Sequence, residues 1–140
     1  MTHPVEAIAS FMSLGGQVVP DDVDRDITTG EICRFIDRVD EEVNETFDAS
    51  GFHDPAFRIQ APVNHAEVLD GFIDAAYAAL TGAIRVAGKE KAKAAWDAVV
   101  DANLSKVDGR FGPPIINPET GKIGKPEGWI APDIEAIINN

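Results

Sequence analysis

Closely spaced carboxylates are the residues of this sequence best suited to chemistry. The segment Glu41-Glu42-Val43-Asn44-Glu45 carries three acids. On a helix, Glu42 and Glu45 are i, i+3 neighbours and Glu41 and Glu45 are i, i+4 neighbours, so the three side chains share an arc of about 100° and repel one another. Arg34 and Arg38 fall on the same arc, and a solvated helix face with intrahelical ion pairs is therefore the alternative interpretation.

A second group of acids follows at Glu67, Asp70 and Asp74. On a helix these three lie within about 60° of one another. Apolar residues occupy most of the remaining circumference, so we expect this helix to be buried nearly all round. Residues 59–84 contain no Lys or Arg to offset the several kcal/mol that each desolvated charge costs. A buried carboxyl can instead stay protonated, or pair with a base from another helix such as Arg38.

Two facing helices that each offer carboxylates one turn apart can build an oxygen cage for Mg²⁺, with Mn²⁺ expected to substitute. Gly71, beside the acids, is expected to leave room for ions and ligand. Di-iron bundles need Glu-x-x-His, which is absent, and zinc deaminases need two cysteines, whereas Cys33 is the only one. An all-oxygen Mg²⁺ site points to phosphate chemistry.

Helices must position these acids. Apolar residues at helical spacing predict a first helix over about 4–14. Thr28 and Glu31 have the capping-box spacing that opens a second helix, which we expect to run to about Ser50. Residues 51–62 are predicted to form a connection. The expected core-facing stripe of the second helix is Ile32, Phe35, Ile36, Val39 and Val43.

Further elements complete the predicted fold. Asn64 is expected to cap a third helix that runs to about Ala87 and ends at Gly88. A fourth begins near Lys89, with one side formed by Trp96, Val99, Val100 and Val107.

The C-terminal part has a different composition. Ten of the residues in 108–132 are Gly or Pro, and residues 117–121 form a strong turn signal, which predicts a small hairpin before a last short helix over 133–138. The predicted fold is all-α, with one domain over 1–140. It consists of a four-helix bundle over about 4–107 and an extended Gly/Pro-rich C-terminal arm over 108–140.

Composition excludes several classes of protein. The 140 residues carry a formal charge of −12, which repels nucleic acid and anionic membrane surfaces. A single cysteine permits no intrachain disulfide, and no apolar run approaches the roughly 18 residues that span a bilayer. The first residues lack the basic segment of a signal peptide, so we expect none. We expect a cytoplasmic protein, in the host cytoplasm if a phage encodes it.

The acids also carry a family resemblance. Glu41-Glu42-x-x-Glu45, twenty-one residues, then Glu67-x-x-Asp70 resembles the E-E-x-x-E…E-x-x-D signature of the all-α nucleoside triphosphate pyrophosphohydrolases, a superfamily with MazG-like, dimeric dUTPase-like and phosphoribosyl-ATP pyrophosphohydrolase-like members. The resemblance covers about residues 5–135. It is strengthened by Asp74, by Asn103-x-x-Lys106, and by the tail pairs Gly121-Lys122 and Lys125-Pro126, a pattern of phosphoribosyl-ATP pyrophosphohydrolase-like and phage MazG-like members.

The resemblance implies cleavage of an NTP or dNTP between the α and β phosphates, to NMP and pyrophosphate, by attack of a metal-activated water on the α-phosphate. The implied Mg²⁺ ligands are Glu42, Glu45, Glu67 and Asp70, with Asp74 as a further ligand or an orienting group. Glu41 is the candidate to position or deprotonate the water, or it pairs with Arg38. The resemblance also implies a homodimer or homotetramer with sites formed between subunits.

Basic and polar residues must approach a triphosphate in such an acidic site. Lys106, Lys122 and Lys125 are the candidates, although Lys106 near a helix C-terminus could simply favour the helix dipole. Asn103 lies on the Trp96 stripe, where a buried amide needs a partner, either substrate or a backbone carbonyl. Trp129 could stack on a base or pack the tail onto the bundle.

Two other functions stay open from the sequence. One is the same chemistry on dUTP or phosphoribosyl-ATP. The other is a catalytically silent helical module that binds nucleotide or metal.

Overall fold

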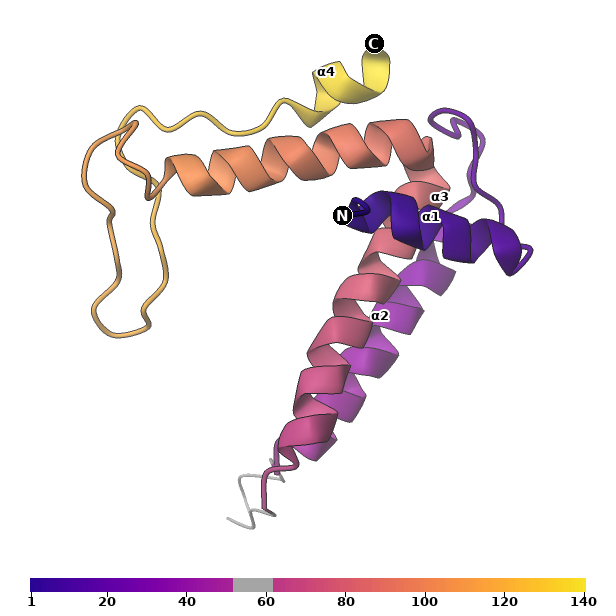
Figure 1. Ribbon diagram of the computed structural model, residues 1–140, viewed down its shortest axis with the longest axis horizontal. Helices are drawn as coiled ribbons and strands as arrows, with labels where there is room; N and C mark the ends of the chain where they lie inside the picture. Colours follow the sequence, from indigo (N-terminus) through magenta and orange to yellow (C-terminus); the bar gives the residue numbers. More distant parts are fainter. Residues whose placement is uncertain (52–61) are drawn as a thin grey trace. The chain divides into compact units, whose positions relative to one another are not determined.

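The computed structural model describes residues 1–51 and 62–140, and the chain is mostly helical (Figure 1). Its helices are α1 (Pro4–Leu14), α2 (Thr29–Ala49), α3 (His65–Ser105) and α4 (Ile134–Asn139). Within these described ranges no strand forms, and one isolated bridge pairs Ile116 with Ile123. The predicted all-α class is confirmed.

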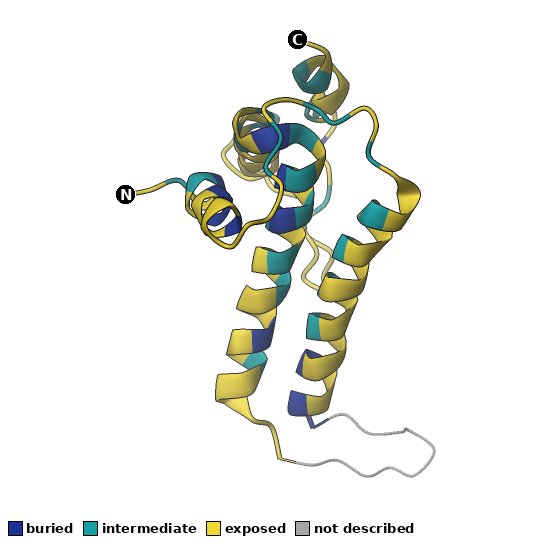
Figure 2. Ribbon diagram, turned by 90° about the vertical axis from the view of Figure 1, so that its right-hand side faces the viewer, coloured by how far each residue is buried: buried dark blue, intermediate teal, exposed yellow. Residues whose placement is uncertain are grey.

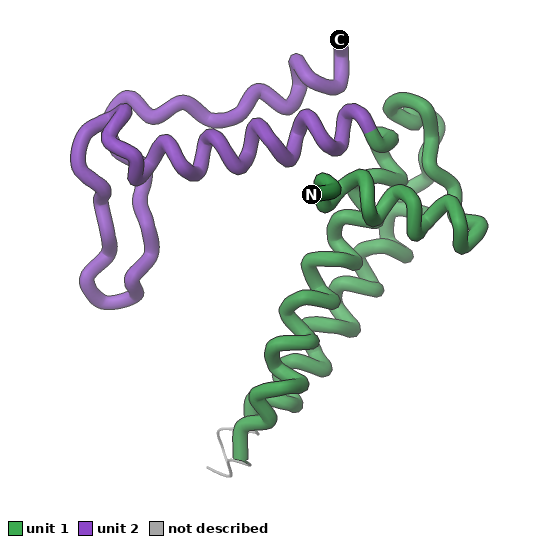
Figure 3. Tube along the Cα trace, in the orientation of Figure 1, with its two compact units in different colours: residues 1–89 green, residues 90–140 purple. Residues whose placement is uncertain are grey.

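The chain divides into two compact units, residues 1–89 and 90–140 (Figure 3). The first unit contains α1, α2 and the first part of α3, and the second contains the rest of α3 and the C-terminal segment. The connection predicted over 51–62 lies almost wholly outside the described residues.

Side-chain caps start the helices where the sequence predicts. Thr28 Oγ1 accepts a hydrogen bond from the backbone N–H of Glu31 at 3.1 Å, and Glu31 Oε2 accepts one from the N–H of Thr28 at 3.4 Å. This pair is the predicted capping box. Asn64 Oδ1 accepts from the N–H of Glu67 at 3.1 Å, which satisfies a free donor in the first turn of α3.

Gly88 interrupts α3 as predicted. Its φ of +80° and ψ of 169° are not helical, and a Cβ there would lie 2.5 Å from the carbonyl oxygen of Pro20. Only glycine fits such a close approach at positive φ. The fourth predicted helix therefore corresponds to the part of α3 that follows Gly88 and ends at Ser105.

In the first unit, α2 and the first part of α3 run side by side in opposite directions (Figure 1). The buried and half-buried residues of each helix face the other helix, and their outer sides are exposed (Figure 2). The prediction that the third helix is buried nearly all round is wrong, because Leu69, Phe72 and Ile73 are 65%, 66% and 59% exposed. The physical reason is that α2 covers only one side of α3.

The predicted stripe of α2 is also only partly correct. Phe35 and Val39 are half-buried on the side facing α3, whereas Ile32, Ile36 and Val43 are exposed. The apolar stripe is wider than the surface that α3 covers, so part of it packs on α3 and the rest stays exposed. The fully buried core of this unit instead includes Val5 and Met12 of α1 and Ile84 of α3.

An ion-pair network holds the segment before α2. Arg85 Nη1 lies 2.8 Å from Asp24 Oδ2, and Arg85 Nη2 lies 3.0 Å from Glu31 Oε2. The backbone N–H of Asp24 also donates to the carbonyl oxygen of Val86 at 2.9 Å. The hydrogen bond from Arg85 lowers the pKa of Asp24 below its usual 3.8, with a smaller contribution from the N–H of Asp26.

The second unit is organised around Trp129 and Arg110. The indole Nε1 of Trp129 donates to the carbonyl oxygen of Ala102 at 2.8 Å, which fastens the C-terminal segment to α3. Arg110 pairs with Asp101 and Asp108, each at 2.8 Å, and lowers the pKa of both carboxylates. Asp133 caps the short α4, which begins at Ile134, one residue after the start of the helix predicted over 133–138.

None of the helices in residues 1–51 and 62–140 combines the length and apolar character needed to cross a bilayer.

We predict that the Asp24–Arg85 pair makes stability depend on pH at the acid end. Because the folded-state pKa of Asp24 lies below the unfolded value, its stabilisation is present above the unfolded pKa and is lost as pH falls through the folded pKa. Asp24→Asn should therefore melt below wild type at neutral pH, and the difference should shrink below about pH 4.

Melting temperatures of both proteins from about pH 7 to about pH 3 measure this effect. Asp26→Asn in the same segment is the control. A melting difference that stays constant across the whole range would contradict the prediction.

Candidate functional site

Six carboxylates from two helices face a single cavity of the first unit. The cavity has a volume of about 450 Å³, and its acidic lining consists of Glu42, Glu45, Asp48, Glu67, Asp70 and Asp74. The first three belong to α2 and the others to α3. All five residues predicted to hold metal are therefore brought to one place, which we call the acidic cavity.

Thr46 and Gly71 set the distance between the two helices at the acidic cavity. Both residues are buried, and a Cβ on Gly71 would overlap Thr46 Oγ1 and lie 3.0 Å from Thr46 Cβ. Thr46 Oγ1 donates to the carbonyl oxygen of Glu42 at 2.7 Å, so its hydroxyl is satisfied within α2. Gly71 was expected to leave room for ions, but its missing side chain serves the close approach of α2 to α3.

The acids of the two helices interact electrostatically. The pKa of Glu42 is raised, first by partial desolvation and then by the negative charges of Glu45 and Asp74, with Asp70 contributing less. Glu45 lies on the same helix as Glu42, whereas Asp70 and Asp74 lie across the cavity on α3. The negative potential is therefore a property of the cavity as a whole rather than of one helix face.

The acids are not desolvated to the extent that the sequence suggested. Glu42 is half-buried and the other five are exposed at the cavity, because the buried side of α3 is the side that meets α2. The five exposed acids therefore avoid most of the cost of desolvation, but like charges that share one cavity still repel one another.

A cation would relieve that repulsion. Across residues 1–51 and 62–140, no Lys or Arg forms an ion pair with any of the six acids. The chemistry of the donor set fits Mg²⁺ or Mn²⁺, which take carboxylate oxygens. In the same part of the chain, no three His, Cys, Asp or Glu side chains are already drawn together as ligands of one ion.

Glu41 does not line the acidic cavity. It lines a neighbouring cavity of about 320 Å³, together with Arg38, and shares that cavity with Glu42 and Asp74. Arg38 lies over the ring of Phe35, 4.6 Å from its centroid. Among the described residues, Arg38 forms no ion pair with Glu41, so the predicted alternative of an Arg38–Glu41 pair is not what this structure contains.

Asp48 is a member of the acidic cavity that the sequence analysis did not identify. It lies three residues after Glu45, and this i, i+3 spacing was the signal that could have included it. The family signature ends at Glu45 on this helix and does not extend to Asp48.

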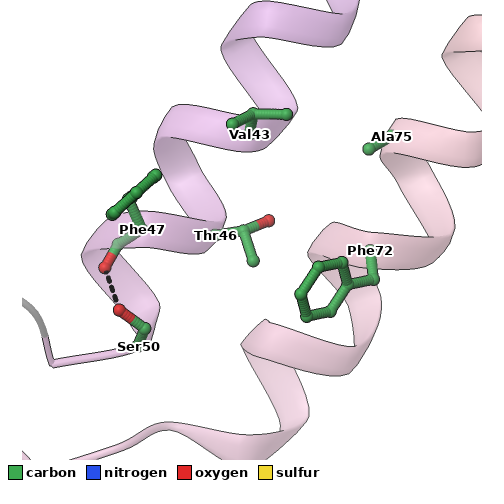
Figure 4. Close-up of a pocket in the computed structure, with 6 residues that line it drawn as sticks. All are labelled: Val43, Thr46, Phe47, Ser50, Phe72 and Ala75. Carbon is green, nitrogen blue, oxygen red and sulfur yellow. Dashed lines mark hydrogen bonds between the residues drawn. The ribbon is translucent and has the colours of Figure 1, made fainter. Parts of the chain in front are cut away.

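The opposite side of the same helix pair is apolar. Val43 and Thr46 of α2 face Phe72 and Ala75 of α3 across a cavity of about 200 Å³ (Figure 4). Phe47 and Ser50 complete its lining, and Ser50 Oγ donates to the carbonyl oxygen of Phe47 at 2.6 Å. The helix pair therefore has one acidic and one apolar side.

Four of the five predicted substrate-binding residues contact one another within the second unit. Lys106 Nζ lies 4.8 Å and Lys125 Nζ 5.2 Å from the centroid of the Trp129 ring, and Lys106 Nζ donates to Asn103 Oδ1 at 3.0 Å. The two distances from a lysine Nζ to the ring centroid are within the range of cation–π interactions. Trp129 thus performs the packing role that was one of its two predicted alternatives, since its indole N–H is bound to α3.

Two details of this group differ from the sequence analysis or extend it. Asn103 was expected to be buried, but it is exposed, as are Trp96, Val99 and Val100 on the same stripe. The reason is that the Ala102 and Ser105 side of α3, not the Trp96 side, receives Trp129. Lys122 lies next to the Ile116–Ile123 bridge, where its carbonyl oxygen accepts from the N–H of Asn117 at 2.9 Å.

No protein-family model matches this sequence, and no curated protein matches it significantly. The resemblance to the pyrophosphohydrolases therefore stays a prediction from the spacing of the carboxylates.

We predict that Gly71→Ala destabilises the protein by about 1–3 kcal/mol, because the added methyl group must force α2 and α3 apart. Gly30→Ala is the matched control on α2. A Cβ there would meet nothing closer than Thr28 Oγ1 at 3.9 Å, so this change should stabilise the helix, by up to about 1 kcal/mol.

Urea unfolding of the two variants measures both values. If both glycine replacements shifted stability in the same direction, the close contact would not constrain the helices as described.

Proposed function

We propose that the protein is a Mg²⁺-dependent nucleoside triphosphate pyrophosphohydrolase that cleaves an NTP or dNTP to the monophosphate and pyrophosphate. The observation that carries this proposal is the convergence of Glu42, Glu45, Glu67, Asp70 and Asp74 on one cavity without cationic partners among the described residues. A volume of about 450 Å³ is within the range of small-molecule sites.

The five acids are the metal ligands of this proposal. Glu42, Glu45, Glu67 and Asp70 would hold Mg²⁺, and Asp74 would hold or orient it. When bound, the cation supplies charge neutralisation for the phosphates and electrophilic assistance to the attack of water. Asp48, on the same cavity, adds negative potential that favours cation binding.

Glu41 has the role of aligning the water and taking its proton. The oxygen of water bonds to the α-phosphorus as the bond from that phosphorus to the bridging oxygen breaks, and pyrophosphate leaves. Glu41 borders the acidic cavity through Glu42 and Asp74, without lying among the ligands themselves. Its carboxylate is therefore suited to act on the water rather than on the cation.

The cations of this proposal are the lysines predicted from the sequence to bind substrate. Lys106 and Lys125 are held on one indole ring, and together with Lys122 they would counter the charge of the triphosphate. Asn103 would donate its amide to the phosphate or sugar. The MazG-like bundle with its Gly/Pro-rich arm, and a reducing cytoplasmic setting for the exposed Cys33, belong to the same proposal.

We predict that the wild-type chain with Mg²⁺ releases pyrophosphate from at least one substrate among the eight common NTPs and dNTPs, dUTP and phosphoribosyl-ATP. Asp70→Asn should lower the rate by about 10- to 100-fold or more, because a neutral amide binds Mg²⁺ less strongly than a carboxylate. Asp40→Asn is the control, since Asp40 lies on α2 outside both cavities and accepts from Asn44.

If no substrate in the panel yields pyrophosphate, hydrolysis is excluded. Metal-dependent thermal stabilisation in the same preparation would then identify a binding module instead.

We further propose that a second copy of the chain covers the apolar side of α2 and α3, giving a homodimer or a homotetramer. Ile36, Phe47 and Phe72 are each more than half exposed, although large apolar residues are normally buried. Packing this side on its equivalent in a second copy would bury it and complete a four-helix arrangement.

We predict that Phe72→Asp lowers the molar mass measured by light scattering to that of the monomer, because the new charge would have to be desolvated. Val18→Asp, at an exposed apolar residue before α2, is the control. A wild-type chain that is monomeric at every tested concentration would contradict the proposal.

A further inference from the structure

The cavity next to the acidic cavity has a composition of its own. It lies wholly within the first unit and combines residues of α1, of the turn after it, of α2 and of α3. Its lining is Phe11, Gln17, Arg38, Glu41, Glu42, Asp74, Tyr77, Ala78 and Thr81. Because Glu42 and Asp74 line both cavities, the two adjoin along these side chains.

An aromatic pair forms part of its wall. The rings of Phe11 and Tyr77 lie edge to face, with their centroids 5.3 Å apart and an interplanar angle of 81°. Phe11 is 54% exposed and Tyr77 is 36% exposed. This wall therefore offers π surface that a flat ring can cover.

Polar groups complete the same cavity. Gln17 is exposed, and its side-chain amide can both donate and accept. Arg38 has no ion pair with the acids in the described parts of the chain. The hydroxyl of Thr81, in contrast, is already used, since it donates to the carbonyl oxygen of Ala78 at 2.6 Å. Gln17 and Arg38 are thus among the side chains able to recognise a ligand's polar edge.

We infer that this second cavity binds the nucleoside part of a nucleotide, an assignment that rests on the proposed function for the position of the phosphates. The base lies against the Phe11–Tyr77 pair, and Gln17 hydrogen-bonds the edge of the base. The shared residues Glu42 and Asp74 place the nucleoside beside the cavity that takes the phosphates and their cation. A volume of about 320 Å³ is adequate for a base with its sugar.

The direct test uses nucleosides, which carry no phosphate and need no metal. Each common nucleoside is titrated into the full-length ¹⁵N-labelled chain at millimolar concentration. At least one should shift the side-chain amide signal of Gln17, and Tyr77→Leu should weaken its binding by about fivefold or more. Tyr77→Phe should restore most of the lost affinity, since it keeps the ring.

Gln17→Ala is the second variant, because Gln17 is exposed and its replacement does not threaten folding. Ser13→Ala on α1 is its matched control. Gln17→Ala should weaken binding of the same nucleoside, and it should raise KM for the corresponding triphosphate more than it changes kcat.

The outcomes separate this inference from the proposed function. Nucleoside binding that depends on Tyr77 in a chain that hydrolyses nothing would support the cavity and exclude the hydrolase. Hydrolysis with no nucleoside-dependent shift, and with the same KM in wild type, Tyr77→Leu and Gln17→Ala, would overturn the cavity and leave the hydrolase.

Discussion

The close approach of α2 to α3 at Thr46 and Gly71 is the contact on which the candidate site depends. Each of these residues stands beside an acid of the cavity, Glu45 on one helix and Asp70 on the other. Without a side chain on Gly71, the helices come close enough for acids of both to share one volume. Carboxylates on separate helices repel, so packing must hold them in place. In the proposed function, a bound cation would offset their charge.

Each of the two helices buries only the side that faces the other helix, so the sides on either edge of this contact stay exposed (Figure 2). One side of the pair gathers the acids, and the other exposes Val43, Phe47 and Phe72. The raised pKa of Glu42 reflects the first side, where negative groups of both helices act on it. The apolar side is the one that a second copy of the chain would cover.

Aromatic rings organise polar groups at two places in the chain. In the second unit, the indole of Trp129 holds Lys106 and Lys125 while its N–H binds α3. In the first unit, the guanidinium of Arg38 lies over the ring of Phe35, and the ring of Phe11 contacts that of Tyr77 at the cavity beside the acids. Arg38, Lys106 and Lys125 thus lie near ring faces, and within residues 1–51 and 62–140 none of the three forms an ion pair with a carboxylate. Their charges are therefore available for an anionic ligand.

The sequence by itself determined the local structure of this protein. The capping box at Thr28 and Glu31, the cap at Asn64 and the break at Gly88 all depend on residues close together in the chain, so their spacing was sufficient to predict them. The acids could be predicted as a group for the same reason, because i, i+3 and i, i+4 spacings place side chains on one helix face. Only the tertiary structure decided which side of each helix is covered. The wide apolar stripes of α2 and α3 permit several packing directions. The choice among them left Phe72 exposed, placed Glu41 in the neighbouring cavity and kept Asn103 at the surface. That choice depends on contacts between residues far apart in the chain, such as the contact of Thr46 with Gly71, and helical periodicity carries no information about them.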